Sequence, residues 1–377
     1  MRIAILTQPL KTNYGGILQA WALQQVLTRL GHTPITIDRQ YNRRARLATV
    51  PGKAKRFLQD AVLATRGQTL YQRHLTYICA RQSAFIRQNI LLSPTIQGDA
   101  ELYQYFQKNK FDAVVVGSDQ VWRPCYSPNI ESYFLNFVDA LNRPPPKRLA
   151  YGASFGVDHW EFSPEQTKIC SEMAQRFDAI SVRESSAIQL SRENLGVAAE
   201  LVADPTLLLD KEDYIRSFCP DAKSAAKGVF TYILDEDDFK KNVVSEVERQ
   251  LGMERFSQQP RPSQRTIVRR DISGYQFPPT DSWLRGFQEA KYVVTDSFHG
   301  TVMSLIFEKP FIAIANSARG AARFQSLLSL VGLENRLISK SEEFEADKLI
   351  EPVDFSEVRS KLDTLRASSI AFLGKHL

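Results

Sequence analysis

The sequence predicts an α/β fold with two parallel sheets, and three observations support this prediction. Short β-branched segments alternate with segments of helical periodicity along the whole chain, which is typical of parallel α/β proteins. The chain has 377 residues, more than a single hydrophobic core usually serves. The alternation is interrupted near residues 204–227, where turn-forming and charged residues gather. We therefore expect two domains joined by a short hinge.

Each expected element is either a short apolar strand or a helix with one apolar stripe. In the first half we expect strands at 3–7, 34–38, 111–118, 148–154 and 179–182, and helices at 15–30, 163–176 and 184–192. In the second half we expect strands at 228–234, 292–295 and 311–314, and helices at 237–251, 281–289, 299–307, 319–331 and 355–372. Ligands of such folds bind outside the carboxyl ends of the strands, so we expect a site in the cleft between the two sheets.

Composition and charge argue against several classes of protein. Hydrophobic residues make up 43% of the chain and charged residues 24%, which is ordinary for a soluble protein. No apolar run approaches the length of about 20 residues that spans a bilayer, and the first residues do not resemble an export signal. The four cysteines are far apart and have no histidine at ligand spacing. We therefore expect a cytoplasmic protein with reduced thiols and no metal site.

A basic stretch runs from Arg39 to Arg87, where eleven lysines and arginines stand against the single acid Asp60. One interpretation is a solvated helical face. The other is attraction to an anionic surface or substrate, such as phosphate-linked lipid headgroups at the inner face of the cell membrane. Nucleic acid is not an expected partner, because the aromatic residues of this stretch fall at helix-core spacing and no recognised binding module accompanies them.

Asn13, Tyr14, Gly15 and Gly16 lie between the first expected strand and its helix. Two glycines at this point let a ligand or another backbone approach the N-terminus of the helix closely. The alternative is a tight turn with no ligand. The pattern Gly-x-Gly-x-x-Gly is absent, so the segment does not indicate a dinucleotide site.

Ser118, Asp119 and Trp122 follow a fully apolar strand. Asp119 could act as a base or orient the hydroxyls of a substrate, and Trp122 offers an apolar face that suits stacking on a sugar ring. The alternative is that Asp119 caps the next turn and Trp122 belongs to the core.

Arg183 ends another strand and directly precedes a helix. Its planar guanidinium suits bidentate binding of a carboxylate or a phosphate in the cleft. The alternative is an ion pair with Glu184 or Asp204. We expect the functional role, because an arginine at this edge is costly to hold unless something anionic lies beside it.

His299 follows the strand at 292–295 and begins a helix, with small polar residues around it that include Ser297 and Gly300. The strand delivers this histidine to the carboxyl edge of the sheet, where the next helix exposes its first backbone N–H groups. The pattern predicts an anion site that contains a titratable group.

Taken together, these motifs resemble those of the polysaccharide pyruvyl transferase family, in the same order and over about residues 1–315. The segments that carry the resemblance are 13–16, 115–122, 151–156, 181–184, 202–206 and 295–301. The resemblance implies two Rossmann-like domains in a fold like that of the GT-B glycosyltransferases. It implies an N-terminal domain over 1–207 with a basic helical insertion at about 39–90, a C-terminal domain over 208–350, and a helix over 351–377 that crosses back to the first domain.

The resemblance also implies the reaction, in which pyruvate moves from phosphoenolpyruvate onto two hydroxyls of one sugar. The products are a cyclic ketal and free phosphate, and no cofactor is expected beyond phosphoenolpyruvate as co-substrate. Arg183 and His299 match the positions that hold phosphoenolpyruvate, and Ser297 and Gly300 beside His299 are further candidates for binding it. His299 and Asp119 are the candidates for catalysis. The N-terminal domain is expected to bind the acceptor, a polysaccharide or its lipid-linked precursor.

One departure concerns Ser297, because some members of the family have an arginine at this position. Arg319, Arg323 or the cluster at 265–270 could supply the missing cation. Two other functions remain open on the sequence alone. They are a glycosyltransferase of the same fold that uses a nucleotide sugar, and a non-catalytic glycan-binding relative.

Overall fold

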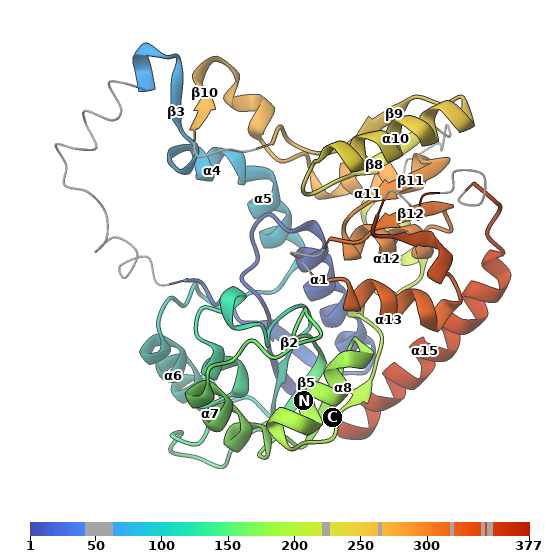
Figure 1. Cartoon of the computed structure of the whole chain (residues 1–377). Helices are drawn as coiled ribbons and strands as arrows, with labels where there is room; N and C mark the ends of the chain where they lie inside the picture. Colours follow the sequence, from blue (N-terminus) through green and yellow to red (C-terminus); the bar gives the residue numbers. More distant parts are fainter. Residues whose placement is uncertain (42–62, 221–226, 263–265, 317–319, 341–343, 345–349) are drawn as a thin grey trace.

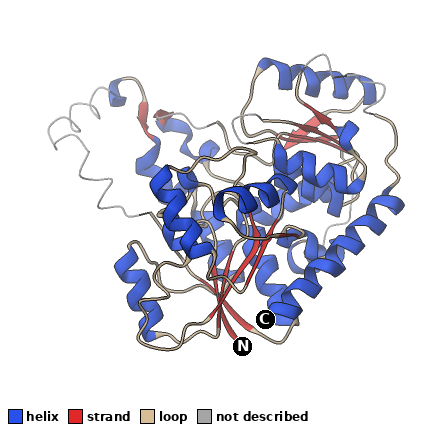
Figure 2. Cartoon of the chain, turned by 60° about the horizontal axis from the view of Figure 1, so that its bottom comes forward, coloured by secondary structure: helices blue, strands red, loops and turns tan. Residues whose placement is uncertain are grey.

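The structure is a computed structural model that describes residues 1–41, 63–220, 227–262, 266–316, 320–340, 344 and 350–377 (Figure 1). Two lobes face each other, and each is built on a parallel sheet. Helices pack around the strands of the first lobe (Figure 2). The predicted α/β class with two Rossmann-like lobes is confirmed.

Within the described residues, the first sheet has six parallel strands in the order β2-β1-β4-β5-β6-β7. Its strands are β1 (Arg2–Leu6), β2 (Thr33–Thr36), β4 (Ala113–Val116), β5 (Lys147–Ala153), β6 (Ala179–Val182) and β7 (Glu200–Leu201). Its helices are α1 (Tyr14–Arg29), α6 (Asp99–Lys108), α7 (Pro164–Ala174) and α8 (Ser185–Leu190). The central strand β4 is buried at every position, which explains its uninterrupted apolar sequence.

The second sheet has the order β13-β12-β11-β8-β9 and is parallel throughout its described strands. Its strands are β8 (Val229–Tyr232), β9 (Arg255–Ser257), β11 (Tyr292–Thr295), β12 (Phe311–Ile314) and β13 (Leu337–Ile338). Its helices are α10 (Asp238–Leu251), α11 (Thr280–Glu289), α12 (Phe298–Ile306) and α13 (Ala322–Val331). The boundary expected at 207/208 falls between the last strand of the first sheet and the first strand of the second.

The expected basic insertion contains a strand as well as helices. Its described part comprises β3 (Gln68–Leu70), α4 (Leu75–Ile78) and α5 (Ala80–Asn89). Strand β3 pairs antiparallel with β10 (Thr266–Val268) of the second lobe, and the pair extends to one side of the molecule (Figure 1). Ile78, Cys79 and Ile267 form a small core beneath this pair. The insertion therefore ties the two lobes together through its own sheet.

The described arginines of the basic stretch are not all exposed. Arg39 is 3% exposed and pairs with Asp99 at 2.5 Å. Residues 42–62 lie outside the described residues. The remaining arginines of the stretch are exposed at positions 66, 73, 81 and 87.

The connection between the lobes contains a 3-10 turn (Pro205–Leu208) and α9 (Lys211–Phe218). The last helix, α15 (Phe355–His376), runs from the second lobe back to the first (Figure 1). There the Lys147 ammonium donates to the His376 carbonyl at 3.1 Å, and the Ala203 N–H donates to the Ser369 hydroxyl at 2.8 Å. The predicted return of the C-terminal helix is confirmed.

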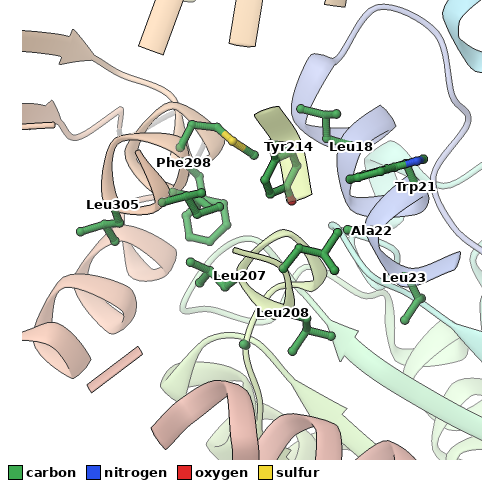
Figure 3. Packing of buried hydrophobic residues seen from close by; sticks show 14 of the residues in the cluster. Leu18, Trp21, Ala22, Leu23, Leu207, Leu208, Tyr214, Phe298 and Leu305 are labelled. Atoms are coloured by element: carbon green, nitrogen blue, oxygen red, sulfur yellow. The ribbon is translucent and has the colours of Figure 1, made fainter. Parts of the chain in front are cut away.

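The lobes share one large hydrophobic core. Helix α1 packs on the connecting turn, and α12 packs on the other side of it (Figure 3). The labelled residues of this core are Leu18, Trp21, Ala22 and Leu23 of α1, Leu207 and Leu208 of the turn, Tyr214 of α9, and Phe298 and Leu305 of α12. This shared packing holds the first turns of α1 and α12 at the boundary between the lobes.

Candidate functional site

A cavity of about 980 Å³ lies between the two lobes, at the carboxyl edges of both sheets. Its wall includes the segments that follow β1, β4, β8 and β11, which is where the order of the strands predicts a ligand. Of the predicted site residues, the following line the cavity: Asn13, Tyr14, Asp119, Ser297 and His299. The other predicted site residues are not part of the cavity lining: Gly15, Gly16, Ser118, Trp122, Arg183 and Gly300.

The N-terminus of α12 forms one side of the cavity. Ser297 is the N-cap, and its hydroxyl accepts a hydrogen bond from the Gly300 N–H at 3.3 Å. The N–H of Gly300 is thus engaged within the helix, not directed at a ligand. A Cβ on Gly300 would lie 2.2 Å from Thr295 Oγ1, so the first turn of the helix packs tightly on the end of β11. These contacts set the position of His299.

His299 reaches across to the first lobe. A Cβ on Gly15 would lie 2.0 Å from His299 Cγ, so the glycine provides the space that the imidazole occupies. The sequence predicted that a ligand or a backbone would approach this glycine, and the structure places the histidine side chain there instead. Residues from both lobes thereby meet at the start of α1.

Arg183 does not line the cavity, although the sequence analysis expected its guanidinium to face the cleft. Its side chain is fully buried, with Nη1 donating to Asp204 Oδ2 at 2.5 Å and Nη2 donating to Asp119 Oδ1 at 2.9 Å. Its Nε lies 4.0 Å from Glu184 Oε2. The sequence left an ion pair with Asp204 open as the alternative, and this pair is what the structure contains.

Two carboxylates are therefore held ionised inside the protein. Burial raises the pKa of Asp119, but the charges of Arg183, His299 and Arg323 outweigh it and bring this pKa below its usual value. Burial also raises the pKa of Asp204, and His299 and Arg183 outweigh it, so that this pKa lies well below the usual range. Asp119 has a φ of +69°, a strained conformation that the site maintains.

Three arginines line the cavity, Arg255, Arg261 and Arg323, and Arg323 at the start of α13 is the buried one. It is 5% exposed, and its Cζ lies 5.4 Å from the centroid of the Phe298 ring. Burial and the neighbouring charge of Arg183 lower the pKa of Arg323 to about 10. An anion in the cavity would relieve this repulsion. Arg323 was one of the cations that the sequence offered in place of an arginine at Ser297, whereas Arg319 and Arg265 lie outside the described residues.

Asn13 and Tyr14 face the cavity from the start of α1. The Asn13 amide donates to Asp119 Oδ2 at 3.4 Å. The Tyr14 hydroxyl donates to the Pro278 carbonyl at 2.7 Å, and its ring stacks on Trp283 with centroids 5.2 Å apart. Tyr14 therefore anchors α1 to the second lobe in addition to lining the cavity.

Trp122 and Ser118 correct the sequence analysis. Trp122 is fully buried, its indole N–H donates to the Tyr133 carbonyl at 3.1 Å, and its ring stacks on Phe134. The Ser118 hydroxyl is buried and donates to the Gly152 carbonyl at 2.6 Å. Neither side chain can meet a sugar, and the core alternative for Trp122 is correct.

The sequence analysis placed Asp204 at the hinge and left it open as an ion-pair partner of Arg183, but it did not foresee that Asp204 also lies beside His299. Its Oδ2 lies 2.5 Å from Arg183 Nη1 and 3.7 Å from His299 Nε2, so it joins the two residues that the sequence predicted would meet on a ligand. The signal available was an acid beside a proline at the hinge, which by itself indicates a cap. Among the described residues, no group of three or more His, Cys, Asp or Glu side chains could hold a metal ion. No described helix is long and apolar enough to cross a membrane.

Comparison with known proteins agrees with this architecture. The fold is similar to that of MnaA from S. aureus in its co-structure with UDP, at 11% sequence identity and a TM-score of 0.50, covering 96% of this chain and 90% of that chain. An O-GlcNAc transferase mutant from Thermobaculum terrenum matches at 11% identity and a TM-score of 0.47, covering 100% of this chain and 66% of that chain. The UDP-GlcNAc 2-epimerase from Neisseria meningitidis, bound to UDP-GlcNAc, matches at 9% identity and a TM-score of 0.49, covering 98% of this chain and 94% of that chain.

At such low identity the similarity to MnaA shows the fold alone, which is of the GT-B type. No curated protein sequence matches the chain. A family model for polysaccharide pyruvyl transferases matches residues 13–318, which is most of the chain and most of the cavity wall, although Arg323 lies beyond the match. The chain therefore belongs to the polysaccharide pyruvyl transferase family.

Proposed function

We propose that this protein transfers pyruvate from phosphoenolpyruvate onto two hydroxyls of one sugar, forming a cyclic ketal and releasing phosphate. One observation carries the proposal: a single cavity wall brings together the N-terminus of α12, His299 and Arg323. Phosphoenolpyruvate has a carboxylate and a phosphate, and a site for it needs fixed cations beside a helix N-terminus. Membership of the family supports the same transfer.

In this proposal Arg323 and His299 bind the anionic groups of the donor, beside the cap residue Ser297. Arg183 does not bind the donor directly, because its guanidinium is paired with Asp119 and Asp204. The N-terminus of α12 contributes a partial positive charge at the same wall. The proposed reaction uses phosphoenolpyruvate as its co-substrate and no separate cofactor.

The proposed chemistry begins with protonation of the methylene carbon of phosphoenolpyruvate, which makes C2 electrophilic. One sugar hydroxyl attacks C2 and loses its proton, the bond between C2 and the phosphate oxygen breaks, and the second hydroxyl then adds to C2 and loses its proton. His299 is the candidate to bind the phosphate or to move the first proton. Asp119 is the candidate to accept a hydroxyl proton, because its lowered pKa keeps it ionised at neutral pH and it lines the cavity.

The size of the cavity supports an acceptor beside the donor. Cavities for drug-sized ligands span about 300–1,000 Å³, and this one, at about 980 Å³, is large for phosphoenolpyruvate alone. Asn13 and Tyr14 mark the side of the first lobe, where we place the acceptor sugar of a polysaccharide or of its lipid-linked precursor.

A cytoplasmic enzyme with such an acceptor would meet the membrane at its inner face. Exposed arginines surround the β3–β10 pair, including Arg66, Arg269 and Arg270, and the Arg269 N–H donates to the Gly67 carbonyl at 2.9 Å. Tyr77 and Val268 are exposed apolar residues in the same region. We propose that this region makes peripheral contact with anionic lipid, each basic residue contributing about 1 kcal/mol near the surface.

Titration calorimetry with phosphoenolpyruvate tests the donor. We expect binding, and we expect His299→Ala and Arg323→Gln to weaken it. A UDP-sugar serves as the comparison ligand, because a glycosyltransferase of the same fold would prefer it. Binding of the UDP-sugar, combined with no binding of millimolar phosphoenolpyruvate, would overturn the proposal.

A further inference from the structure

The imidazole of His299 has one nitrogen sealed inside the protein. Nε2 is buried, makes no hydrogen bond and lies 3.7 Å from Asp204 Oδ2. This separation is too long for a hydrogen bond and short enough for an ion pair if the ring is protonated. A buried ring nitrogen without a hydrogen-bond partner costs free energy. A small movement of the ring would bring Nε2 within hydrogen-bonding distance of Asp204.

Asp204 itself is held on both of its oxygens. Oδ1 accepts hydrogen bonds from the Thr206 N–H at 3.0 Å and from the Thr206 hydroxyl at 2.6 Å. Oδ2 accepts from Arg183 Nη1 at 2.5 Å. The side chain of Asp204 is 1% exposed, so water does not compete for these contacts. The Asp204 carboxylate is thus held in place beside the His299 ring, which belongs to the second lobe.

We propose that Asp204 is a positioning residue, which holds His299 with its Nε2 proton directed at the carboxylate and leaves Nδ1 to act on the donor. Arg183 and Thr206 keep Asp204 in place. The identity of the donor rests on the function proposed above, whereas the orientation of the ring does not. The same arrangement explains why a buried arginine stands beside the site without lining it.

Three acids and two arginines surround His299. The acids in this environment are Asp119 beside β4, Asp204 at the hinge and Glu184 behind Arg183, and the cations are Arg183 after β6 and Arg323 on α13. Burial raises the pKa of Glu184.

The tautomer of His299 tests the proposal directly. The chain has five histidines, and His299→Gln identifies the signal of interest in the long-range ¹H–¹⁵N spectrum of the ring nitrogens. For the neutral ring we expect the proton on Nε2. A wild-type protein whose neutral His299 carries its proton on Nδ1 would overturn the proposal, and this measurement requires no ligand.

Two variants test the consequence for binding. Asp204→Asn places an amide where the carboxylate accepts its bonds, and Thr206→Val removes one of those bonds with less risk to folding. We expect both to change the tautomer signal, and Asp204→Asn to weaken phosphoenolpyruvate binding about 10- to 100-fold, as for loss of a charged hydrogen bond. Asp210→Asn is the matched control, because Asp210 is exposed and caps α9.

The outcomes separate the two proposals. If the wild type does not bind phosphoenolpyruvate but shows the Nε2–H tautomer, the function proposed above fails while the positioning role stands. If the wild type binds and folded Asp204→Asn or Thr206→Val retains both the tautomer and the affinity, the positioning role is wrong.

Discussion

Replacing Gly15 with alanine should displace His299 and leave most of the fold intact. The new Cβ would lie 2.0 Å from His299 Cγ, 2.2 Å from Nδ1 and 2.4 Å from Cβ. Non-bonded carbon atoms normally lie about 3.5–4.0 Å apart. The imidazole therefore has to move by about 1.5 Å or more. Helix α12 cannot retreat as a whole, because its first turn already packs against Thr295.

The ring should therefore rotate away from Asp204 and from the cavity wall. Forcing a methyl group into a packed site costs about 1–3 kcal/mol of stability. Loss of the charged contact from His299 should weaken phosphoenolpyruvate binding by a further factor of about 10–100. We therefore expect Gly15→Ala to be folded, modestly destabilised and much weaker in binding the donor.

Titration calorimetry and thermal unfolding measure the two effects separately. Gly374→Ala is the matched control, because a Cβ at Gly374 meets nothing within 4 Å. Alanine is favoured over glycine inside a helix by up to about 1 kcal/mol, so this control should be as stable as the wild type or more so. Wild-type affinity in Gly15→Ala, with an unchanged His299 ring signal, would refute the assignment of His299 to the donor site.

Four further predictions follow from the site and the surface. Arg323→Gln should weaken phosphoenolpyruvate binding about 10- to 100-fold by calorimetry, without loss of fold. Trp122→Ala should lower the free energy of unfolding by about 3–5 kcal/mol in a denaturant titration while the folded fraction keeps its donor affinity. The pKa of Asp204 in the folded protein lies below its ordinary value of 3.8. The ionised carboxylate should therefore stabilise the fold above pH 3.8, and this stabilisation should be lost as the pH falls through the folded pKa. The free energies of unfolding of Asp204→Asn and of the wild type should become equal in acid. Binding to anionic liposomes should weaken as salt rises and with Arg269→Ser.

Each of these predictions has a contrary result. If Arg323→Gln binds phosphoenolpyruvate as tightly as the wild type does, Arg323 is not part of the donor site. Loss of donor affinity in folded Trp122→Ala would contradict its purely structural role. A stability difference for Asp204→Asn that persists to low pH would show that the ionised carboxylate is not its source. Salt-independent or absent liposome binding would leave the arginines of the β3–β10 region as a solvated face.

The fold was predictable in detail wherever a local pattern governs structure. The strands at 179–182, 292–295 and 311–314 have the predicted bounds, because each is a short, largely buried and mostly apolar run. The predicted place of His299 at the head of a helix followed from the same logic. By contrast, β3 and β10 have three residues each, too few to show the alternation of a strand. They are strands only because they pair with each other across the two lobes.

By itself the sequence determined that the chain has two parallel sheets, that its site lies at their carboxyl edges and that a histidine and an aspartate line it. The tertiary structure alone decided the partners of each charged group. Arg183 faces two carboxylates that the chain brings from positions 64 and 21 residues away, and Trp122 faces the core and not a sugar. The physical reason is that backbone periodicity is local, whereas the choice between a ligand and an internal ion pair depends on which distant groups are packed within bonding distance.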